Sequence, residues 1–318
     1  MSESKGTAVI DWFSFTFSAW PNMPESVPEM VRQWLFDFLG VPILGESGNG
    51  LYGFEHSVSF SAYNFGETTN ICQLAWGGAN QRGRVYVSLN GSGCALVKDW
   101  HIVHALVKSL PDIRLTRVDV AVDALNGELD IRTAREWYDQ GDFNAGGRRP
   151  TASMVDDLGT NKGSTLYIGK RENGKFARIY EKGKQLGDSS SPWNRFEVEL
   201  HNRDREIPLD ICVRPSEYFA GCYPCCQGLV DVGAERIRTI RAEMEISLAR
   251  LRTYCRIAYG KLINVISVRS ADDPATILES LTVPGVPRRL EKSALAVVQS
   301  EASAASLSPG VHHHAISS

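Results

Sequence analysis

Residues 165–185 read Thr165-Leu-Tyr-Ile-Gly-Lys-Arg-Glu-Asn-Gly-Lys-Phe-Ala-Arg-Ile-Tyr-Glu-Lys-Gly-Lys-Gln185, which is two short runs of strand-forming residues around an Asn-Gly pair. Asn-Gly between such runs is the strongest short-range signal of a β-hairpin with a two-residue turn. Because side chains alternate along a strand, four residues of the second run are predicted to share one face. They are Phe176, Arg178, Tyr180 and Lys182. A tyrosine between two cations is unusual on a strand, and it makes Tyr180 a candidate nucleophile.

Two further predicted strands, residues 115–123 and 195–201, have an apolar side and an acidic side. Alternation places the valines of the first strand on one face and its two aspartates on the other. The second strand divides in the same way. The four acids are Asp119, Asp123, Glu197 and Glu199. If these strands share a sheet with the hairpin, the acids face the same side as Tyr180.

This set of side chains has one chemical and one structural interpretation. Carboxylate oxygens suit Mg²⁺ or Mn²⁺ better than zinc, and such an ion polarises a phosphodiester. A tyrosine hydroxyl, with a pKa of about 10, is a weak nucleophile unless a nearby cation favours its phenolate; Arg178, Lys182 or the metal would do so. Alternatively, the acids and bases form only cross-strand salt bridges on a solvated face.

The remaining pattern predicts an α+β fold, with an antiparallel sheet that carries the site on one face and helices on the other. Residues 90–94 read as a glycine-rich turn and residues 141–164 as a long loop. No internal repeat is evident. Strands are predicted at 8–17, 59–63, 71–76, 84–89, 115–123 and 195–201, and helices at 30–39, 100–110, 130–140, 233–266 and 274–281.

Composition shifts divide the chain into five predicted regions. They are a disordered N-terminus (1–7), an N-terminal α+β half (8–110), a catalytic half (111–230), a helical region (231–285) and a disordered tail (286–318). The helix at 233–266 has an arginine-rich exposed face. That face suits contact with DNA as well as it suits plain solvation.

Charge and cysteine content restrict the class of protein. The formal net charge of −3 argues against a chain that coats nucleic acid with its whole surface, although residues 162–184 hold seven Lys/Arg and two Glu. No apolar run is long enough to span a bilayer, and residues 1–6 do not resemble a signal peptide, so a cytoplasmic, membrane-free protein is expected.

The seven cysteines are expected to be reduced, and Cys222-Tyr-Pro-Cys225-Cys226 lacks the second pair of a zinc site.

Six motifs occur in an order that resembles the replication initiation factor family (Rep_trans type) of filamentous phages and rolling-circle plasmids. They are Asp11-Trp-Phe-Ser-Phe-Thr-Phe, Ser88-Leu-Asn-Gly-Ser-Gly-Cys94, Leu115-Thr-Arg-Val-Asp-Val-Ala-Val-Asp123, Thr165-Leu-Tyr-Ile-Gly-Lys-Arg171, Ile179-Tyr-Glu-Lys182 and Arg195-Phe-Glu-Val-Glu-Leu200. The resemblance covers roughly residues 8–265. It implies a nicking and closing enzyme that cuts one strand at the double-strand origin, keeps a 5′-phosphotyrosine link, and later rejoins the displaced strand.

The resemblance also implies roles for individual residues and partners. Tyr180 would be the nucleophile, assisted by Lys182, with Tyr167 as its rival. The metal ligands, for Mg²⁺ or Mn²⁺, would come from Asp119, Asp123, Glu197 and Glu199. The DNA contacts would come from Lys170, Arg171, Lys175, Arg178 and Arg195. The partners would be double- and single-stranded origin DNA, a host helicase and a DNA polymerase.

Two other functions remain open from the sequence. A noncatalytic origin-binding protein or transcriptional regulator would bind DNA through the same basic surface but would not cleave it. A metal nuclease that activates water would nick DNA without a covalent protein–DNA link.

Overall fold

The computed structural model describes residues 6–19, 27–64, 67–144, 148–203, 205–234, 248–269 and 273–284. The chain divides into two compact units, Met1–Ile240 and Arg241–Ser318. The predictions of disorder for 1–7 and 286–318 fall almost wholly outside the described residues, and so does the first part of the helix predicted at 233–266.

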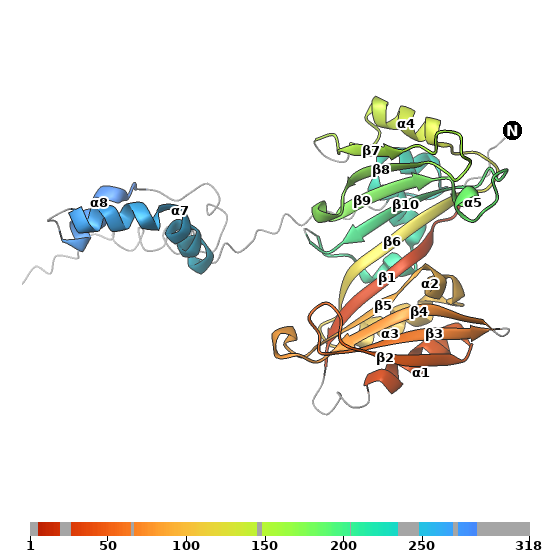
Figure 1. The fold of residues 1–318 in the computed structure, drawn as a ribbon, viewed down its shortest axis with the longest axis horizontal. Coiled ribbons are helices and arrows are strands. Elements are labelled where there is room, and N and C mark those ends of the chain that lie inside the picture. The colour runs from red at the N-terminus through yellow and green to blue at the C-terminus, as the bar shows by residue number, and fades with distance from the viewer. Residues whose placement is uncertain are drawn as a thin grey trace, which may run out of the picture. The chain divides into compact units, whose positions relative to one another are not determined.

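The first unit is built on one ten-stranded sheet in which every neighbouring pair of strands is antiparallel (Figure 1). Its order is β2-β3-β4-β5-β1-β6-β10-β9-β8-β7. The strands are β1 Val9–Ser18, β2 Ile43–Gly48, β3 His56–Asn64, β4 Glu67–Trp76, β5 Arg84–Leu89, β6 Arg114–Ala124, β7 Ala152–Val155, β8 Thr165–Lys170, β9 Lys175–Tyr180 and β10 Asn194–His201. The predicted α+β class and antiparallel sheet are confirmed.

Helices pack on one face of this sheet through aromatic contacts. Phe196 on β10 meets Phe219 with ring centroids 5.2 Å apart, and Phe13 on β1 meets Trp100 at 5.4 Å. The longer helices are α1 Val27–Leu39, α2 Gly91–Leu96, α3 Trp100–Ser109, α4 Ile131–Gln140 and α6 Pro215–Cys222. Short helical turns are η1 Ala79–Gln81, η2 Arg171–Asn173, α5 Lys182–Gln185, η3 Leu209–Cys212 and η4 Pro224–Gly228. The second unit contains α7 Leu248–Arg269 and α8 Pro274–Leu281.

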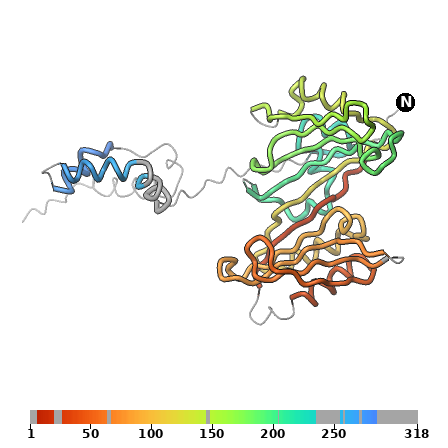
Figure 2. The backbone as a smooth tube through the Cα atoms, in the orientation of Figure 1, coloured from red at the N-terminus to blue at the C-terminus, as the bar shows by residue number. Residues whose placement is uncertain are grey.

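The order of elements repeats within the first unit, although the sequence shows no repeat. Each half is a central strand, a helix, a run of four antiparallel strands, and then closing helical turns. The first half runs from β1 to α3 and the second from β6 to η4, and they join where β1 and β6 pair (Figure 2). Two halves with this architecture need the same pattern of apolar faces but not the same residues. The repeat of elements therefore does not require a repeat in the sequence.

Several local predictions were wrong in detail. The hairpin turn has four residues and not two, because η2 is followed by Gly174 in the left-handed region (φ 73°). Residues 90–94 begin a helix, since the Asn90 side chain caps α2 by accepting from the Gly93 amide at 3.0 Å. The loop predicted at 141–164 contains β7, and β2 was missed altogether. Both are edge strands whose side chains are almost all exposed, so they lack an apolar pattern.

Phe196 fills the centre of the second half, where it is fully buried against Phe143 and Phe219. We expect Phe196→Ala to lower the free energy of unfolding by about 3–5 kcal/mol, because the cavity loses aromatic contacts that neighbours cannot replace. Phe36→Ala, at a side chain that is 49% exposed on α1, is the matched control and should cost less than about 1 kcal/mol. Urea denaturation followed by circular dichroism measures both, and equal losses would contradict this account of the core.

Candidate active site

The register of three strands sets the site on the face opposite the helices. Across β9, β10 and β6, Cα partners form the row Phe176–Glu199–Asp119, and the next row is Arg178–Glu197–Ala121. A third row is Tyr180–Arg195–Asp123. Neighbouring residues of each strand point to the helices, so these rows share the other face. The expectation that the acids and Tyr180 lie on one side of one sheet is therefore met.

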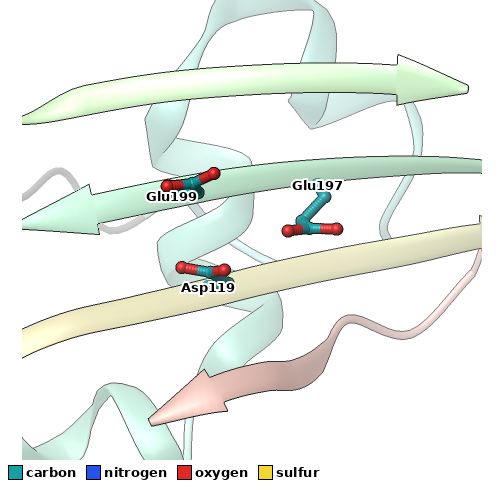
Figure 3. Close-up of side chains that lie close together, drawn as sticks. All are labelled: Asp119, Glu197 and Glu199. Carbon is teal, nitrogen blue, oxygen red and sulfur yellow. The ribbon is translucent and has the colours of Figure 1, made fainter. Parts of the chain in front are cut away.

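Three of the four predicted acids form a cluster. Oxygens of Asp119, Glu197 and Glu199 lie within 4.8 Å of one another, and the three side chains come from β6 and β10 (Figure 3). All three residues are at most 1% exposed. Hard oxygen donors gathered in this way suit Mg²⁺ or Mn²⁺.

The pKa values of two acids in the cluster are shifted in opposite directions. Burial, together with the charges of Glu197 and Glu199, raises the pKa of Asp119 to about 8 against the opposing effect of Arg117. For Glu199, burial alone would raise the pKa. Hydrogen bonds from His201 and Arg171 and the charge of Arg117 outweigh burial and lower the pKa to about 2. Burial therefore dominates the pKa of Asp119, whereas hydrogen bonds and nearby cations dominate that of Glu199.

An arginine accompanies each acid of the cluster. Arg117 donates two hydrogen bonds to Asp119, at 2.8 and 2.5 Å, and its guanidinium stacks on the Trp12 ring. Arg178 donates to Glu197 at 2.6 Å. Arg171 donates to Glu199 at 2.7 Å, and the His201 ring lies 3.2 Å from the same carboxylate. The alternative of salt bridges is thus met in part: three cations pair with the three carboxylates, but the acids are buried and not on a solvated face, and the Arg117–Asp119 pair lies within one strand.

Asp123 lies apart from the cluster. Residues four apart on a strand are about 13 Å apart along it, too far for Asp119 and Asp123 to share one ion. Asp123 instead accepts from the Arg195 guanidinium at 2.7 Å and from the Trp193 indole at 2.7 Å. Arg195 also donates to Asp11 on β1 at 2.7 Å. Arg195 therefore joins β1, β6 and β10, and it is only slightly exposed.

The Tyr180 hydroxyl points to the cluster and donates to Glu197 Oε2 at 3.4 Å. Its ring lies near the Arg178 guanidinium and the Lys182 ammonium, with centroid distances of 5.4 and 5.6 Å. Burial and the Glu197 charge raise the pKa of Tyr180, while Arg195 and Arg178 act in the opposite direction. The hydroxyl therefore keeps its proton until a further cation or a proton acceptor acts on it.

The other predicted site residues differ in their surroundings. Tyr167 pairs with Arg178 across β8 and β9, so it shares the Tyr180 face, and its ring stacks on Phe176. Lys182 is not on the strand, because β9 ends at Tyr180 and Lys182 begins α5. Lys175 lies on the helix side of the sheet, where its ammonium donates to the Cys222 carbonyl at 2.6 Å. Lys170 is exposed and has no ion-pair partner among the described residues.

Within the described residues, the first half of the sheet has no cluster of three acids; on the corresponding face, Glu46 ends a row of uncharged residues that begins at Ser14. Ser14 and Ser88 pair across β1 and β5 and share a hydrogen bond of 2.7 Å. Gln73, the next residue in that row, bonds instead to Ser59. The candidate chemistry therefore belongs to the second half alone.

Sequence reasoning assigned no site role to Asp11, Arg117 or Trp193. Arg117 alternates with Asp119 on the same face, which was a usable signal for a partner of that acid. The contact of Asp11 with Arg195 spans 184 residues, and no local pattern predicts it.

Arg195→Met is expected to destabilise the first unit by about 2–3 kcal/mol, because it removes the shared partner of Asp11 and Asp123. Breaking a fully buried ion pair costs about 3–5 kcal/mol, and the partial exposure of these acids lowers that figure. Lys170→Met removes an exposed cation and should change stability by less than about 0.5 kcal/mol. Urea titrations of the two variants test this; an unchanged Arg195→Met protein would mean that the Arg195 bridge contributes no stability.

Comparison with known proteins gives one family match. The model of the replication initiation factors (Rep_trans) matches residues 113–281, more than half of the chain. A solved structure of a rolling-circle replication initiator protein from Geobacillus stearothermophilus is 26% identical over 62% of this chain and 74% of its own, with a TM-score of 0.45. No curated protein matches. Within the described residues, no helix is long and apolar enough to cross a membrane.

Proposed function

The chain belongs to the replication initiation factor family, and on this basis we propose that it starts rolling-circle replication by nicking one strand of its origin with Tyr180. The observation that carries the proposal is the hydrogen bond from the Tyr180 hydroxyl to Glu197, inside a cluster of three carboxylates. A nucleophile, a proton acceptor and a set of metal-ligand oxygens thus meet on one sheet face.

In the proposed reaction, the Tyr180 oxygen attacks the scissile phosphorus and its proton passes to Glu197. A bond forms between phosphorus and the tyrosine oxygen, and the bond between phosphorus and the 3′ oxygen breaks. The 3′ oxygen takes a proton from water and leaves as a 3′-hydroxyl, and Glu197 returns the tyrosine proton to the solvent. The 5′ end stays on Tyr180. Rejoining is the same exchange in reverse, so no nucleotide triphosphate is consumed.

Asp119, Glu197 and Glu199 are the proposed metal ligands, and a bound Mg²⁺ or Mn²⁺ would neutralise charge that develops on the phosphate. With all three carboxylates ionised, the cluster and its partners Arg117, Arg171 and Arg178 sum to zero charge, so a divalent ion leaves an excess of two positive charges. Two consecutive DNA phosphates balance that excess. The same arginines, together with Lys170 and Lys182, are the proposed phosphate contacts.

A noncatalytic origin-binding role is the second candidate. It is favoured by the arginine partner of each cluster acid and by the low exposure of Tyr180, which is 7%. Catalysis requires these arginines to exchange their carboxylate partners for DNA phosphates, whereas binding without cleavage does not require that exchange.

One assay separates the candidates. Wild-type protein is incubated with supercoiled origin plasmid and Mn²⁺ or Mg²⁺, and the products are run on a denaturing gel. We expect open-circular DNA with protein covalently attached to one 5′ end. Binding without nicking would leave only the noncatalytic role, and nicking without attached protein would indicate a water-activating nuclease.

A further inference from the structure

A polar pocket of about 100 Å³ lies beside Tyr180 and is not part of the acidic cluster. Its lining includes Lys162, Thr165, Tyr167, Arg178, Tyr180 and Gln185. Thr165 pairs with Tyr180, and Tyr167 with Arg178, across β8 and β9, whereas the cluster lies over β10 and β6. Arg178 and Tyr180 therefore stand between the pocket and the candidate metal site.

The loop that walls the pocket is fixed before any ligand arrives. The Asp157 carboxylate accepts from the amides of Gly159 and Gly163, at 2.9 and 3.1 Å. The Ser164 amide donates to Glu181 at 2.8 Å, and Lys184 holds the other oxygen of that carboxylate at 2.8 Å. A wall fixed in this way binds a ligand without first being ordered, which favours affinity.

The lining offers groups that have no partner within the described part of the chain. Arg178 Nε is buried and unbonded, although the same guanidinium bonds Glu197 through Nη2. The side chains of Lys162, Tyr167 and Gln185 likewise make no hydrogen bond or ion pair in the described ranges. These three side chains carry an ammonium, a hydroxyl and an amide that can donate, so the pocket is suited to a ligand that brings acceptor oxygens or nitrogens.

The chemistry of the lining indicates the ligand class. Two cations suit a phosphate, the rings of Tyr167 and Tyr180 suit an unstacked base, and the Gln185 amide both donates and accepts. Sites for drug-sized ligands measure about 300–1,000 Å³, so this pocket has room for one base and not for a base pair. A base can enter only where the DNA is unpaired.

We infer that this pocket binds one unpaired nucleotide next to the scissile phosphate, with Gln185 reading the edge of the base. The inference rests on the proposed function, since it takes Tyr180 as the nucleophile. Lys162 and Arg178 hold the phosphate of that nucleotide, and the base held there fixes which phosphate reaches Tyr180. The pocket thus sets the sequence preference of the cut at one position.

The test measures binding without cleavage. Full-length wild type and Gln185→Ala are mixed, without divalent metal, with single-stranded oligonucleotides randomised over a central window, and the bound DNA is sequenced. We expect wild type to enrich one base at one position by about fivefold or more. Gln185→Ala should lose that enrichment and keep its overall affinity. Gln140→Ala, at an exposed glutamine on α4, should behave as wild type.

A second variant tests the phosphate contact. Lys162→Ala should weaken binding to all sequences alike and reduce the steepness of the salt dependence by about one unit, while base enrichment persists. Unchanged enrichment in Gln185→Ala, or none in wild type, would overturn the inference. If wild type nicks the origin plasmid in that case, the proposed function stands without the pocket. If base enrichment is lost in Gln185→Ala but wild type does not nick the origin plasmid, the inference about the pocket holds and Tyr180 is not a nucleophile.

Discussion

Tyr180→Phe is expected to abolish nicking of supercoiled origin plasmid, with a fall in rate on the order of 10³-fold or more, because it removes the oxygen that attacks phosphorus. The variant loses one hydroxyl and its 3.4 Å hydrogen bond to Glu197, while the ring keeps its place. Folding should therefore be nearly unaffected. Nicked product on an agarose gel and protein covalently attached to DNA on a denaturing gel are the two readouts.

Tyr167→Phe is the matched control, since Tyr167 lies on the same sheet face and its ring stacks on Phe176. It should still nick and form the covalent link. If Tyr167→Phe is inactive and Tyr180→Phe is active, the nucleophile assignment is wrong although the enzyme class stands. If both variants nick and no covalent link forms in either, a water-activating nuclease replaces the proposal.

Asp119→Asn is expected to abolish stabilisation of the protein by Mn²⁺ and to lower the nicking rate on the order of 10²–10³-fold, since a metal ion contributes several kcal/mol to such a transition state. Ligand binding to the folded state alone stabilises it by about 2.7 kcal/mol at 100 times the dissociation constant. Wild type should therefore melt at a higher temperature when Mn²⁺ is added. Asp119→Asn should show no such rise, because the cluster has lost one of its three carboxylates.

Glu136→Gln is the control for this second prediction, because it neutralises an exposed acid on α4 outside the cluster. It should keep both the Mn²⁺-induced rise in melting temperature and the nicking rate. Melting curves with and without metal do not depend on activity, so they test the site even in a catalytically dead protein. A rise in Asp119→Asn equal to that of wild type would show that the ion binds elsewhere or does not need Asp119.

Much of the site could be predicted because strand alternation is a local rule. It placed Arg178 and Tyr180 on one face of their strand, and Glu197 and Glu199 on one face of another. That the two faces coincide followed only on the condition that the strands share one sheet. The edge strands β2 and β7 were missed, because exposed strands carry no apolar period.

The sequence by itself determined the fold class, the face on which each strand places its polar residues, and the resemblance to an initiator family. These depend on strand alternation, helical spacing and motif order, which are read along the chain. Only the tertiary structure decided which of those residues meet. The register of the strands pairs Asp119 with Glu199 and Asp123 with Arg195, and it places the Tyr180 hydroxyl beside Glu197. The Asp123–Arg195 and Tyr180–Glu197 contacts join residues 72 and 17 positions apart, and the pairing of separate strands that sets these distances is not encoded by any local pattern.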